Sequence, residues 1–377
     1  MSEHKMIKRE NWISNFNLIG KAKITNYTFK IDERSEKSGW IYNSLNLGVD
    51  CGEKHGTIYC EMIGGYSENG NNVIYAHGKD EEGKDDFNQQ IVIDWEDRLD
   101  ENILEDIGKR SFITIGIEQT DKGKTFEKRF LSAYDAINYL REHLKDETVI
   151  NVKGNLRYSL YNDKTQVRKN ITSIYLSNAD SPEKYSATFT QSILIDSDSA
   201  NLKADNIDKD KSVMYVNARV LDYVKEINGH EIKGQYPFRK QFEFKMDFTK
   251  PDLCKLLVDK VFKIRKGITQ NTFEGELIEG GSEITLTIND IPDEIKELIE
   301  IGLYNEEDAL RKCSGTGSRE QRMILKRPLI KKLDDGNGTY RFDEKYTEDD
   351  LNFDYIFSNN EDTTDENDDM DWINELE

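Results

Sequence analysis

Two successive stretches of the chain show the same order of predicted elements: three strands, a helix and two further strands. In the first stretch, apolar and polar side chains alternate over residues 16–24, 40–49 and 57–63, which is typical of strands. Apolar residues at helical spacing predict a helix over 133–144, and strands over 149–160 and 166–176 follow it. This half of the chain is therefore expected to be mainly β with one helix.

The second stretch repeats this order of elements but not the residues. Strands are predicted over 185–195, 213–224 and 235–246, and a helix is predicted over 251–263. A hairpin is expected to pair residues 272–278 with 282–288. A short helix over 293–301 and the segment 323–333 close the part that is expected to fold, and residues 177–182 form a linker between the halves.

This order of elements is that of an oligonucleotide/oligosaccharide-binding (OB) barrel, a five-stranded Greek-key barrel with a helix between its third and fourth strands. We therefore predict a mainly β protein with some α structure, built as two OB-like Greek-key barrels followed by a disordered acidic tail. The expected domains are residues 1–180, with an insertion at about 67–145, residues 183–333, and a tail over 334–377.

The C-terminal segment is too acidic to fold by itself. Residues 346–377 contain 13 Asp or Glu and no Lys or Arg, so they cannot bury enough apolar surface to offset the entropy lost on ordering. The tip nevertheless carries Trp372, Ile373 and Leu376, which we predict to bind partner proteins. A single helical turn would bring Trp372 or Ile373 beside Leu376.

A cationic patch stands out against the acidic composition. The net charge is −21, of which −13 belongs to residues 346–377 and −8 to the other 345 residues. Residues 151–175 nevertheless hold five cations and one acid, a local charge of +4. Along a strand over 151–161, alternation places Lys153, Arg157 and Tyr161 on one face, opposite an apolar face. Cations neutralise phosphates and aromatic rings stack on bases, which is the combination that single-stranded nucleic acid requires.

The residues predicted to contact nucleic acid in this patch are Lys153, Arg157, Tyr161, Lys164, Arg168 and Lys169. The alternative explanation is an ordinary barrel strand with a solvated charged face. Trp40 and Tyr42 share one face of the second strand and Tyr59 lies on the third, so they are candidates for base stacking, although aromatic residues in strands are more often part of a core. In the second half, a further candidate surface comprises Arg219, Tyr223, Arg239 and Lys240.

Patterns for catalysis or metal binding are weak. The five His form no ligand-spaced pair and the four Cys form no CxxC motif, so we expect no enzymatic activity, no metal and no cofactor. The run Asp94–Asp97 could hold a divalent metal, but acidic runs of this kind are usually solvated. No apolar run approaches the roughly 20 residues that a membrane span needs, and the N-terminus lacks the apolar core of a signal peptide. A cytoplasmic protein without membrane contact is therefore expected.

The segment NVKGNLRYSLYNDKTQVRKNITSIYLS, residues 151–177, together with the acidic arm, resembles bacteriophage-encoded single-stranded DNA-binding proteins built from OB folds. The resemblance is best over about residues 149–180 and in the tail. It implies sequence-independent binding that protects single-stranded DNA during phage replication and recombination in the host cytoplasm. It also implies recruitment of replication proteins, such as a polymerase, helicase or primase, through the tail. The common bacterial form ends in a Pro-Phe tip, which this chain lacks.

Two other classes of protein remain open at this point. A non-DNA-binding interaction protein, such as a DNA mimic or an assembly factor, would act through its acidic arm and show no DNA affinity after the tail is removed. A nucleic-acid enzyme that uses the Asp94–Asp97 run would cleave its substrate in a magnesium-dependent manner.

Overall fold

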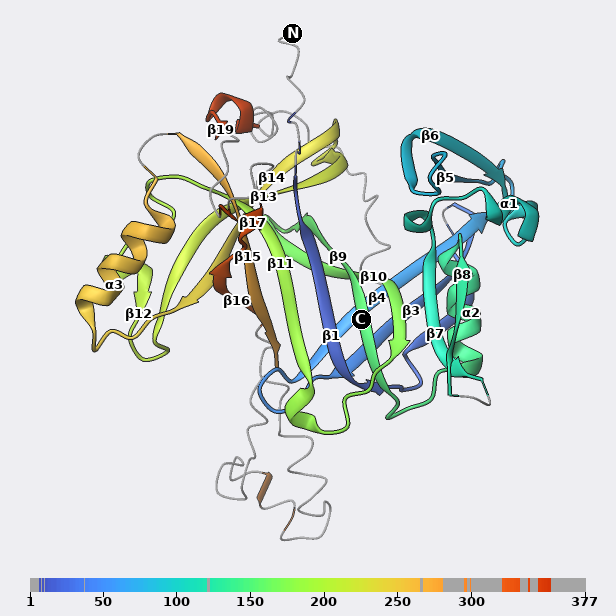
Figure 1. Ribbon diagram of the computed structural model, residues 1–377, viewed down its shortest axis with the longest axis horizontal. Helices are drawn as coiled ribbons and strands as arrows, with labels where there is room; N and C mark the ends of the chain where they lie inside the picture. The colour runs from blue at the N-terminus through green and yellow to red at the C-terminus, as the bar shows by residue number, and fades with distance from the viewer. Residues whose placement is uncertain are drawn as a thin grey trace.

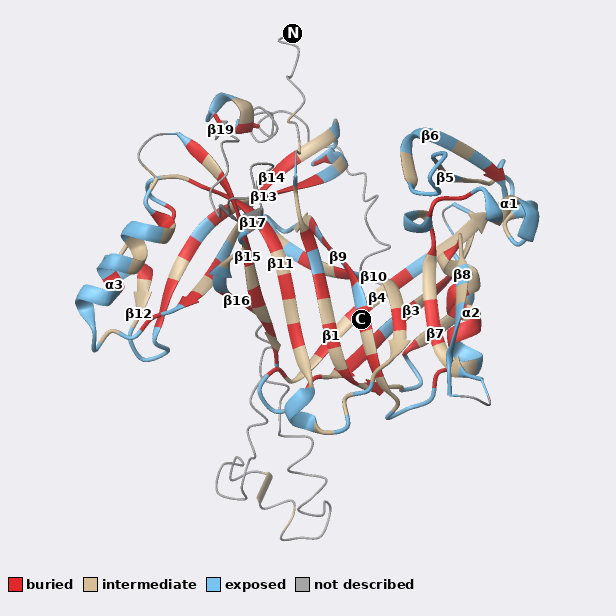
Figure 2. Ribbon diagram, in the orientation of Figure 1, coloured by how far each residue is buried: buried red, intermediate tan, exposed pale blue. Residues whose placement is uncertain are grey.

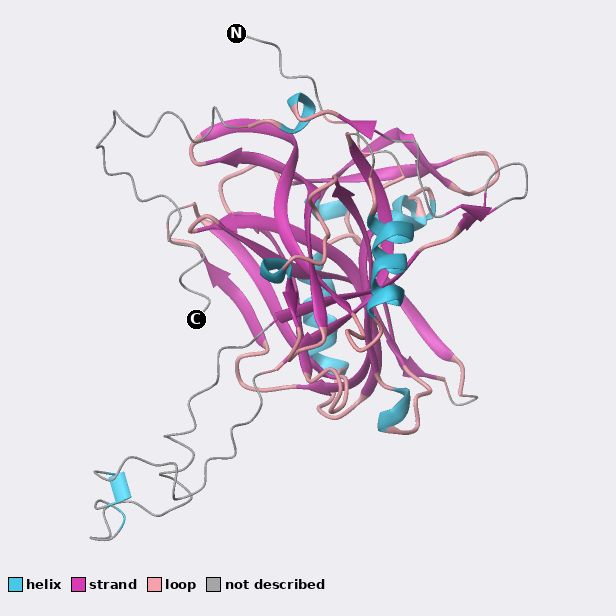
Figure 3. Cartoon of the chain, turned by 90° about the vertical axis from the view of Figure 1, so that its left-hand side faces the viewer, coloured by secondary structure: helices cyan, strands magenta, loops and turns pink. Residues whose placement is uncertain are grey.

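A computed structural model describes most of the chain between its terminal segments. The described residues are 7, 9, 11–36, 38–120, 123–264, 267–280, 321–332 and 345–353, with isolated positions at 295, 296, 299, 338 and 339. Strands dominate the fold (Figure 3), which confirms the prediction of a mainly β protein.

Five strands close the first barrel, which we call barrel 1 (Figure 1). Their order around the barrel is β1 (Ser14–Lys23), β3 (Trp40–Asp50), β4 (Thr57–Ser67), β10 (Lys164–Leu176) and β9 (Val149–Tyr161). Neighbours pair antiparallel, except that β10 meets β4 in parallel. The antiparallel pairing of β9 with β1 closes the ring. Helix α2 (Ala133–His143) lies between β4 and β9 in the chain, as an OB barrel requires.

The local sequence explains the elements that shape this barrel. On β9, Val152, Gly154, Leu156 and Tyr158 are buried, and Lys153, Asn155 and Arg157 between them are exposed, as period-two alternation demands. The turn to β10 has positive φ angles at Asn162 (47°) and Asp163 (59°), which is the geometry of a two-residue hairpin turn. Helix α2 begins after Ser132, whose hydroxyl accepts a hydrogen bond from Tyr134 N (3.1 Å).

A second ring of five strands forms barrel 2. Its order is β11 (Ser186–Ile195), β13 (Val213–Ile227), β14 (His230–Lys245), β16 (Gln321–Pro328) and β15 (Ile268–Glu279). Here too the third and fifth strands, β14 and β16, are the parallel pair. Helix α3 (Pro251–Leu257) and a π-helical turn (Val258–Phe262) follow the third strand. Both barrels therefore have OB-like topology, and the prediction of fold class is confirmed.

The two barrels share one sheet and one core. β1 pairs antiparallel with β11, with Ser14 opposite Gln191 and Ile19 opposite Ser186. Buried side chains run through both barrels as a single apolar cluster, and the buried positions alternate along the strands in Figure 2. The barrels are thus joined by backbone hydrogen bonds as well as by side-chain packing.

The segment between β4 and α2 forms additional structure on barrel 1. It comprises β5 (Val73–Lys79), β6 (Asp85–Asp94), α1 (Glu101–Glu105), β7 (Ile113–Gln119) and β8 (Thr125–Phe130). β7 extends the main sheet by pairing in parallel with β10, whereas β5 and β6 form a separate hairpin. Apolar runs at residues 91–93 and 112–117 indicate short strands, which correspond to β6 and β7, whereas β5 and β8 were not predicted from the sequence.

The remaining elements are short. They are β2 (Phe29–Arg34), β12 (Ile207–Asp208), β17 (Lys331–Lys332), β18 (Gly338–Thr339), β19 (Lys345–Tyr346) and the 3₁₀ turns Trp95–Asp97, Lys109–Ser111, Pro182–Lys184, Ala204–Asn206 and Asp349–Leu351.

The hairpin predicted after β15 requires a correction. β15 pairs antiparallel with β16 over residues 273–279, so its partner is β16 and not residues 282–288. Its other edge pairs with β11 over residues 269–276, so both edges of β15 are occupied along residues 273–276. Residues 282–288 themselves lie outside the described residues, as does nearly all of the predicted helix over 293–301.

Candidate nucleic-acid interface

Two long hairpins, one from each barrel, meet where the barrels join. Arg157 Nη2 on β9 donates to the carbonyl oxygen of Tyr223 on β13 (3.5 Å), and Thr165 Oγ1 on β10 donates to that of Arg239 on β14 (2.7 Å). We call the side chains around this contact the junction surface and define it as Arg157, Tyr161, Lys164, Arg219, Tyr223 and Arg239. The sequence placed these residues on two separate segments, and the tertiary structure brings the two segments together.

Aromatic side chains on the junction surface are exposed to solvent. Tyr161 is 42% exposed and Tyr223 is 43% exposed. A groove of about 530 Å³ lies between the barrels, lined by Leu160 and Thr165 of barrel 1 and by Arg219 and Arg239 of barrel 2. Two acidic residues, Asp163 and Glu348, also line it. Arg219 and Arg239 lie opposite each other on β13 and β14. The groove therefore brings two guanidinium groups together with two carboxylates, and the exposed Tyr161 and Tyr223 are not part of its lining.

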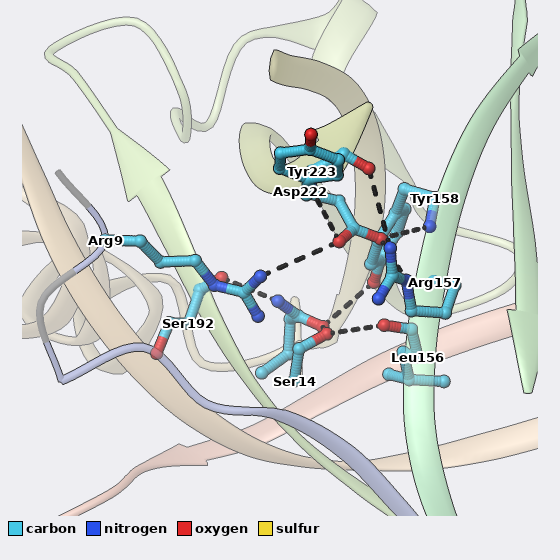
Figure 4. A network of polar contacts seen from close by, with 9 residues as sticks. Arg9, Ser14, Leu156, Arg157, Tyr158, Ser192, Asp222 and Tyr223 are labelled. Carbon is cyan, nitrogen blue, oxygen red and sulfur yellow. Dashed lines mark hydrogen bonds and ion pairs between the residues drawn. The ribbon is translucent and has the colours of Figure 1, made fainter. Parts of the chain in front are cut away.

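A buried carboxylate, that of Asp222, holds the junction together (Figure 4). Asp222 Oδ2 accepts from Tyr158 N (2.8 Å) and pairs with Arg157 Nε (3.0 Å), while Oδ1 accepts from Tyr223 N (2.8 Å) and lies 3.6 Å from Arg9 Nη1. The Asp222 side chain is only 3% exposed, whereas that of Arg157 is 46% exposed. Burial lowers the pKa of Arg9 from its ordinary value, and the Asp222 charge opposes that shift.

Beneath Asp222, buried polar side chains continue from barrel 1 into barrel 2. The Tyr158 hydroxyl donates to Gln191 Oε1 (3.0 Å), and burial raises the pKa of that hydroxyl. Ser14 Oγ lies 2.9 Å from Gln191 Oε1, and Gln191 Nε2 donates to Ser192 O (2.8 Å). Arg9, Gln191 and Asp222 were not predicted from the sequence. Gln191 and Asp222 are polar residues in strands, and such a position does not show what the side chain faces, while Arg9 precedes the first strand.

Two cations of the predicted set lie inside the protein. Lys169 is 5% exposed, and its ammonium group pairs with Glu279 of barrel 2. It follows Arg168 in a strand, so the two side chains take opposite faces and cannot both face solvent. Lys240 is half-buried, and burial together with the Lys169 charge lowers its pKa. We therefore leave Lys169 and Lys240 out of the junction surface.

Lys153 lies further from the hairpin tip, whereas Arg168 lies on β10 directly opposite Arg157. Lys153 is exposed on β9, opposite Asn17 of β1. Arg168 is 33% exposed, with Nη1 3.8 Å from a carboxylate oxygen of Glu61. Both are on the outer surface of barrel 1. Lys153 extends the cationic surface away from the junction, and Arg168 lies beside Arg157 of the junction surface.

The predicted stacking residues of barrel 1 share one face. Trp40 and Tyr42 lie on one face of β3. Gly48, which pairs with Tyr59 of β4, lies on the same face of β3. The rings of Trp40 and Tyr42 stack on each other, with centroids 4.6 Å apart and planes at 16°. Gly48 is eight residues from Trp40, about 26 Å at strand spacing, so Tyr59 does not contact the stacked pair.

The first residues of the predicted acidic tail contact barrel 2. Tyr346 pairs with Ile268 of β15, and its hydroxyl donates to Gln270 (3.2 Å). Glu348 forms an ion pair with Arg219 at 3.0 Å. The ring of Phe353 packs edge-on against Tyr236, with centroids 5.1 Å apart. The tip residues Trp372, Ile373 and Leu376 lie outside the described residues.

Neither a metal site nor a membrane helix is found in the part of the chain that the structure describes. No group of three or more His, Cys, Asp or Glu in that part is placed to hold a metal ion. Asp94, Glu96 and Asp97 are exposed. Among the described helices, none is long and apolar enough to cross a membrane.

The protein consists of two OB-like barrels that are joined at a cationic and aromatic surface. A family model described as YorF matches residues 77–289, more than half of the 377 residues, and the chain belongs to the YorF family. The matched span runs from β5 to the segment after β15 and includes the junction surface.

Two solved structures are similar to this chain at low levels. The single-stranded DNA binding protein from Thermus aquaticus is 10% identical, with a TM-score of 0.30 over 71% of this chain and 86% of that one. A deletion mutant of the same protein is 9% identical, with a TM-score of 0.31 over 71% and 87%. No curated protein matches the sequence.

Proposed function

We propose that this protein binds single-stranded DNA with little sequence preference at the junction surface. The proposal rests on the contact between two hairpins that are distant in the sequence. This contact brings Arg157 and Tyr161 of barrel 1 close to Tyr223 and Arg239 of barrel 2, where the two OB-like barrels join. Cations contact phosphates regardless of base, and exposed tyrosine rings stack on any base at about 1–3 kcal/mol each.

The cationic surface continues along barrel 1 toward Lys153. Lys153 and Tyr161 lie eight residues apart on β9, about 26 Å at strand spacing, which is long enough to contact several nucleotides. In this proposal the protein protects single-stranded DNA during phage replication and recombination in the host cytoplasm. It catalyses no reaction itself, and its acidic tail recruits a replication protein such as a polymerase, helicase or primase. The tail's composition, not its structure, supports that last role.

The test is a titration of labelled oligo(dT) at several salt concentrations. One variant changes Lys153, Lys164 and Arg239 to Gln, and a matched control changes the exposed Lys84, Lys145 and Lys184, which lie away from the junction, to Gln. Each lost phosphate contact reduces the slope of log affinity against log salt by about 0.7, so the junction variant should lose about 2 from the slope. The control should keep the parent slope.

Equal slopes for the parent and the Lys153/Lys164/Arg239 variant would show that DNA does not bind at these three residues. Failure of the parent to bind oligo(dT) would favour the interaction-protein class, in which the acidic arm is the working part. Incubating the DNA with the protein and Mg²⁺ separates binding from cleavage, because a nuclease would shorten the DNA.

A further inference from the structure

The insertion on barrel 1 contains a module that the DNA-binding proposal does not use. Residues 67–112, which we call the insertion module, include β5, β6 and α1 and have a separate core of Ala76, Ile93, Ile107 and Phe112. Figure 1 shows this module on the side of barrel 1 that faces away from barrel 2. It is therefore remote from the junction surface.

The insertion module is fixed to α2 by a partly buried ion pair. Arg98 Nε lies 2.7 Å from Asp135 Oδ2, and Nη2 donates to Oδ1 at 3.1 Å. The same guanidinium lies over the Trp95 ring, 4.1 Å from its centroid. This bidentate pair and the stacked ring hold the hairpin β5–β6 in one position on the barrel.

The outer face of the β5–β6 hairpin exposes apolar side chains. Tyr75 and Val92 lie opposite each other and are 66% and 56% exposed, whereas Ala76 and Ile93 on the other face are buried. An antiparallel hairpin with one face on a core normally carries polar residues on the other. Phe87, 54% exposed, extends the apolar surface beside His77, with ring centroids 4.9 Å apart.

The two edges of this hairpin differ. The outer edge of β5 is covered, because His77 N donates to Ser111 Oγ (2.8 Å) and Gly108 N donates to His77 O (2.7 Å). β6 pairs with β5 and with no other strand among the described residues. An open edge next to an apolar face is the arrangement that accepts an added strand from another chain.

The charge of the insertion module determines which kind of strand it can accept. Residues 67–112 contain 13 acids and five cations, a net charge of −8. Nucleic acid and a second copy of this module are both repelled by that charge, whereas a cationic segment is attracted.

We propose that the insertion module binds an extended, cationic segment of another protein, which adds a strand to β6 and packs apolar side chains on Tyr75 and Val92. Backbone hydrogen bonds along β6 supply affinity, and the apolar pair selects alternating basic and apolar sequences. This interaction does not depend on DNA binding at the junction.

The probe for the test is a short fluorescent peptide of alternating lysine and valine, and a second peptide carries proline at its centre with the same charge. Binding to the full chain is measured by anisotropy, together with amide hydrogen exchange over β6. The double variant Tyr75→Thr/Val92→Thr keeps strand propensity and removes the apolar pair. Its matched control is Tyr27→Thr, because Tyr27 is 84% exposed elsewhere on barrel 1.

We expect the alternating peptide to slow exchange along β6, and the double variant to bind it about tenfold more weakly than the parent or the Tyr27→Thr control. Equal binding of the proline peptide would overturn the proposal, because charge alone would then explain the affinity. Unchanged affinity in the double variant would also overturn it, as would self-association of the parent that the same variant abolishes.

Discussion

Arg157 of barrel 1 and Asp222 of barrel 2 form an ion pair across the junction, with Arg157 Nε 3.0 Å from Asp222 Oδ2. The carboxylate is buried and the guanidinium is partly exposed, so the same pair joins the barrels and presents a cation to solvent. Removing Asp222 should therefore have a different consequence from removing Arg157.

The Asp222→Ala substitution should lower the free energy of unfolding by about 2–4 kcal/mol, because Tyr158 N and Tyr223 N lose their acceptor and Arg9 loses its counter-charge. Urea denaturation measures the loss. Asp198→Ala, at an exposed position on barrel 2, is the control and should stay within about 0.5 kcal/mol of the parent. A comparable loss in both variants would mean that Asp222 has no special structural role.

Gly154→Ala should destabilise barrel 1 by at least about 2 kcal/mol. A Cβ at Gly154 would lie 1.9 Å from the carbonyl oxygen of Asn170 on the paired strand β10, and backbone cannot move aside cheaply. Gly234→Ala is the control, since the nearest atom, Ile232 O, would be 3.5 Å away. Thermal unfolding of the two variants checks this, and similar midpoints would contradict it.

The stability of barrel 1 should depend on pH through Glu147. Hydrogen bonds from Lys21 and Lys23 lower the pKa of Glu147 to about 2, below its ordinary value of 4.5. A depressed carboxyl pKa stabilises the fold above the unfolded value, and this contribution is lost as pH falls from about 4.5 toward 2. The difference in unfolding free energy between the parent and Glu147→Gln should therefore shrink over that window.

The control for Glu147 is a background in which Lys21 and Lys23 are both Met. Glu147→Gln in that background should leave the pH dependence unchanged, because the groups that lower the Glu147 pKa are gone. A pH-dependent difference that persists in the Met background would contradict the assignment to these lysines.

Glu348→Gln should increase affinity for oligo(dT) at low salt by up to about fivefold, because it releases Arg219 from an exposed ion pair of about 0.2–1 kcal/mol. The gain should disappear at high salt, where the pair is screened. Glu53→Gln, an exposed acid on barrel 1, makes the same charge change away from the junction. Equal gains for both variants would indicate an effect of net charge only.

Much of the fold could be predicted because its signals are local. The helix expected over 133–144 is α2 at Ala133–His143, and the strand pair expected on either side of Tyr161–Lys164 is the β9–β10 hairpin. Apolar alternation and turn residues specify such elements within a few residues. β5 was not predicted, because its side chains are mixed and only packing against the module core shows which face is buried.

Pairing between distant segments could not be predicted in the same way. β15 was predicted to pair with residues 282–288, but over residues 273–279 it pairs with β16, because closure of the barrel brings β16 to this edge. Lys169 was expected on the surface with Arg168, but strand alternation turns it inward to Glu279 on the other barrel.

The two OB-like barrels and the concentration of cations over residues 151–175 could be predicted from the sequence, because strand alternation, helical spacing and charge are local properties of the chain. Which of those cations face solvent, and the contact of β9–β10 with β13–β14 around Asp222, could be seen only in the folded protein. The physical reason is that burial and ion pairing depend on what the other barrel places opposite a side chain, and no local pattern carries that information.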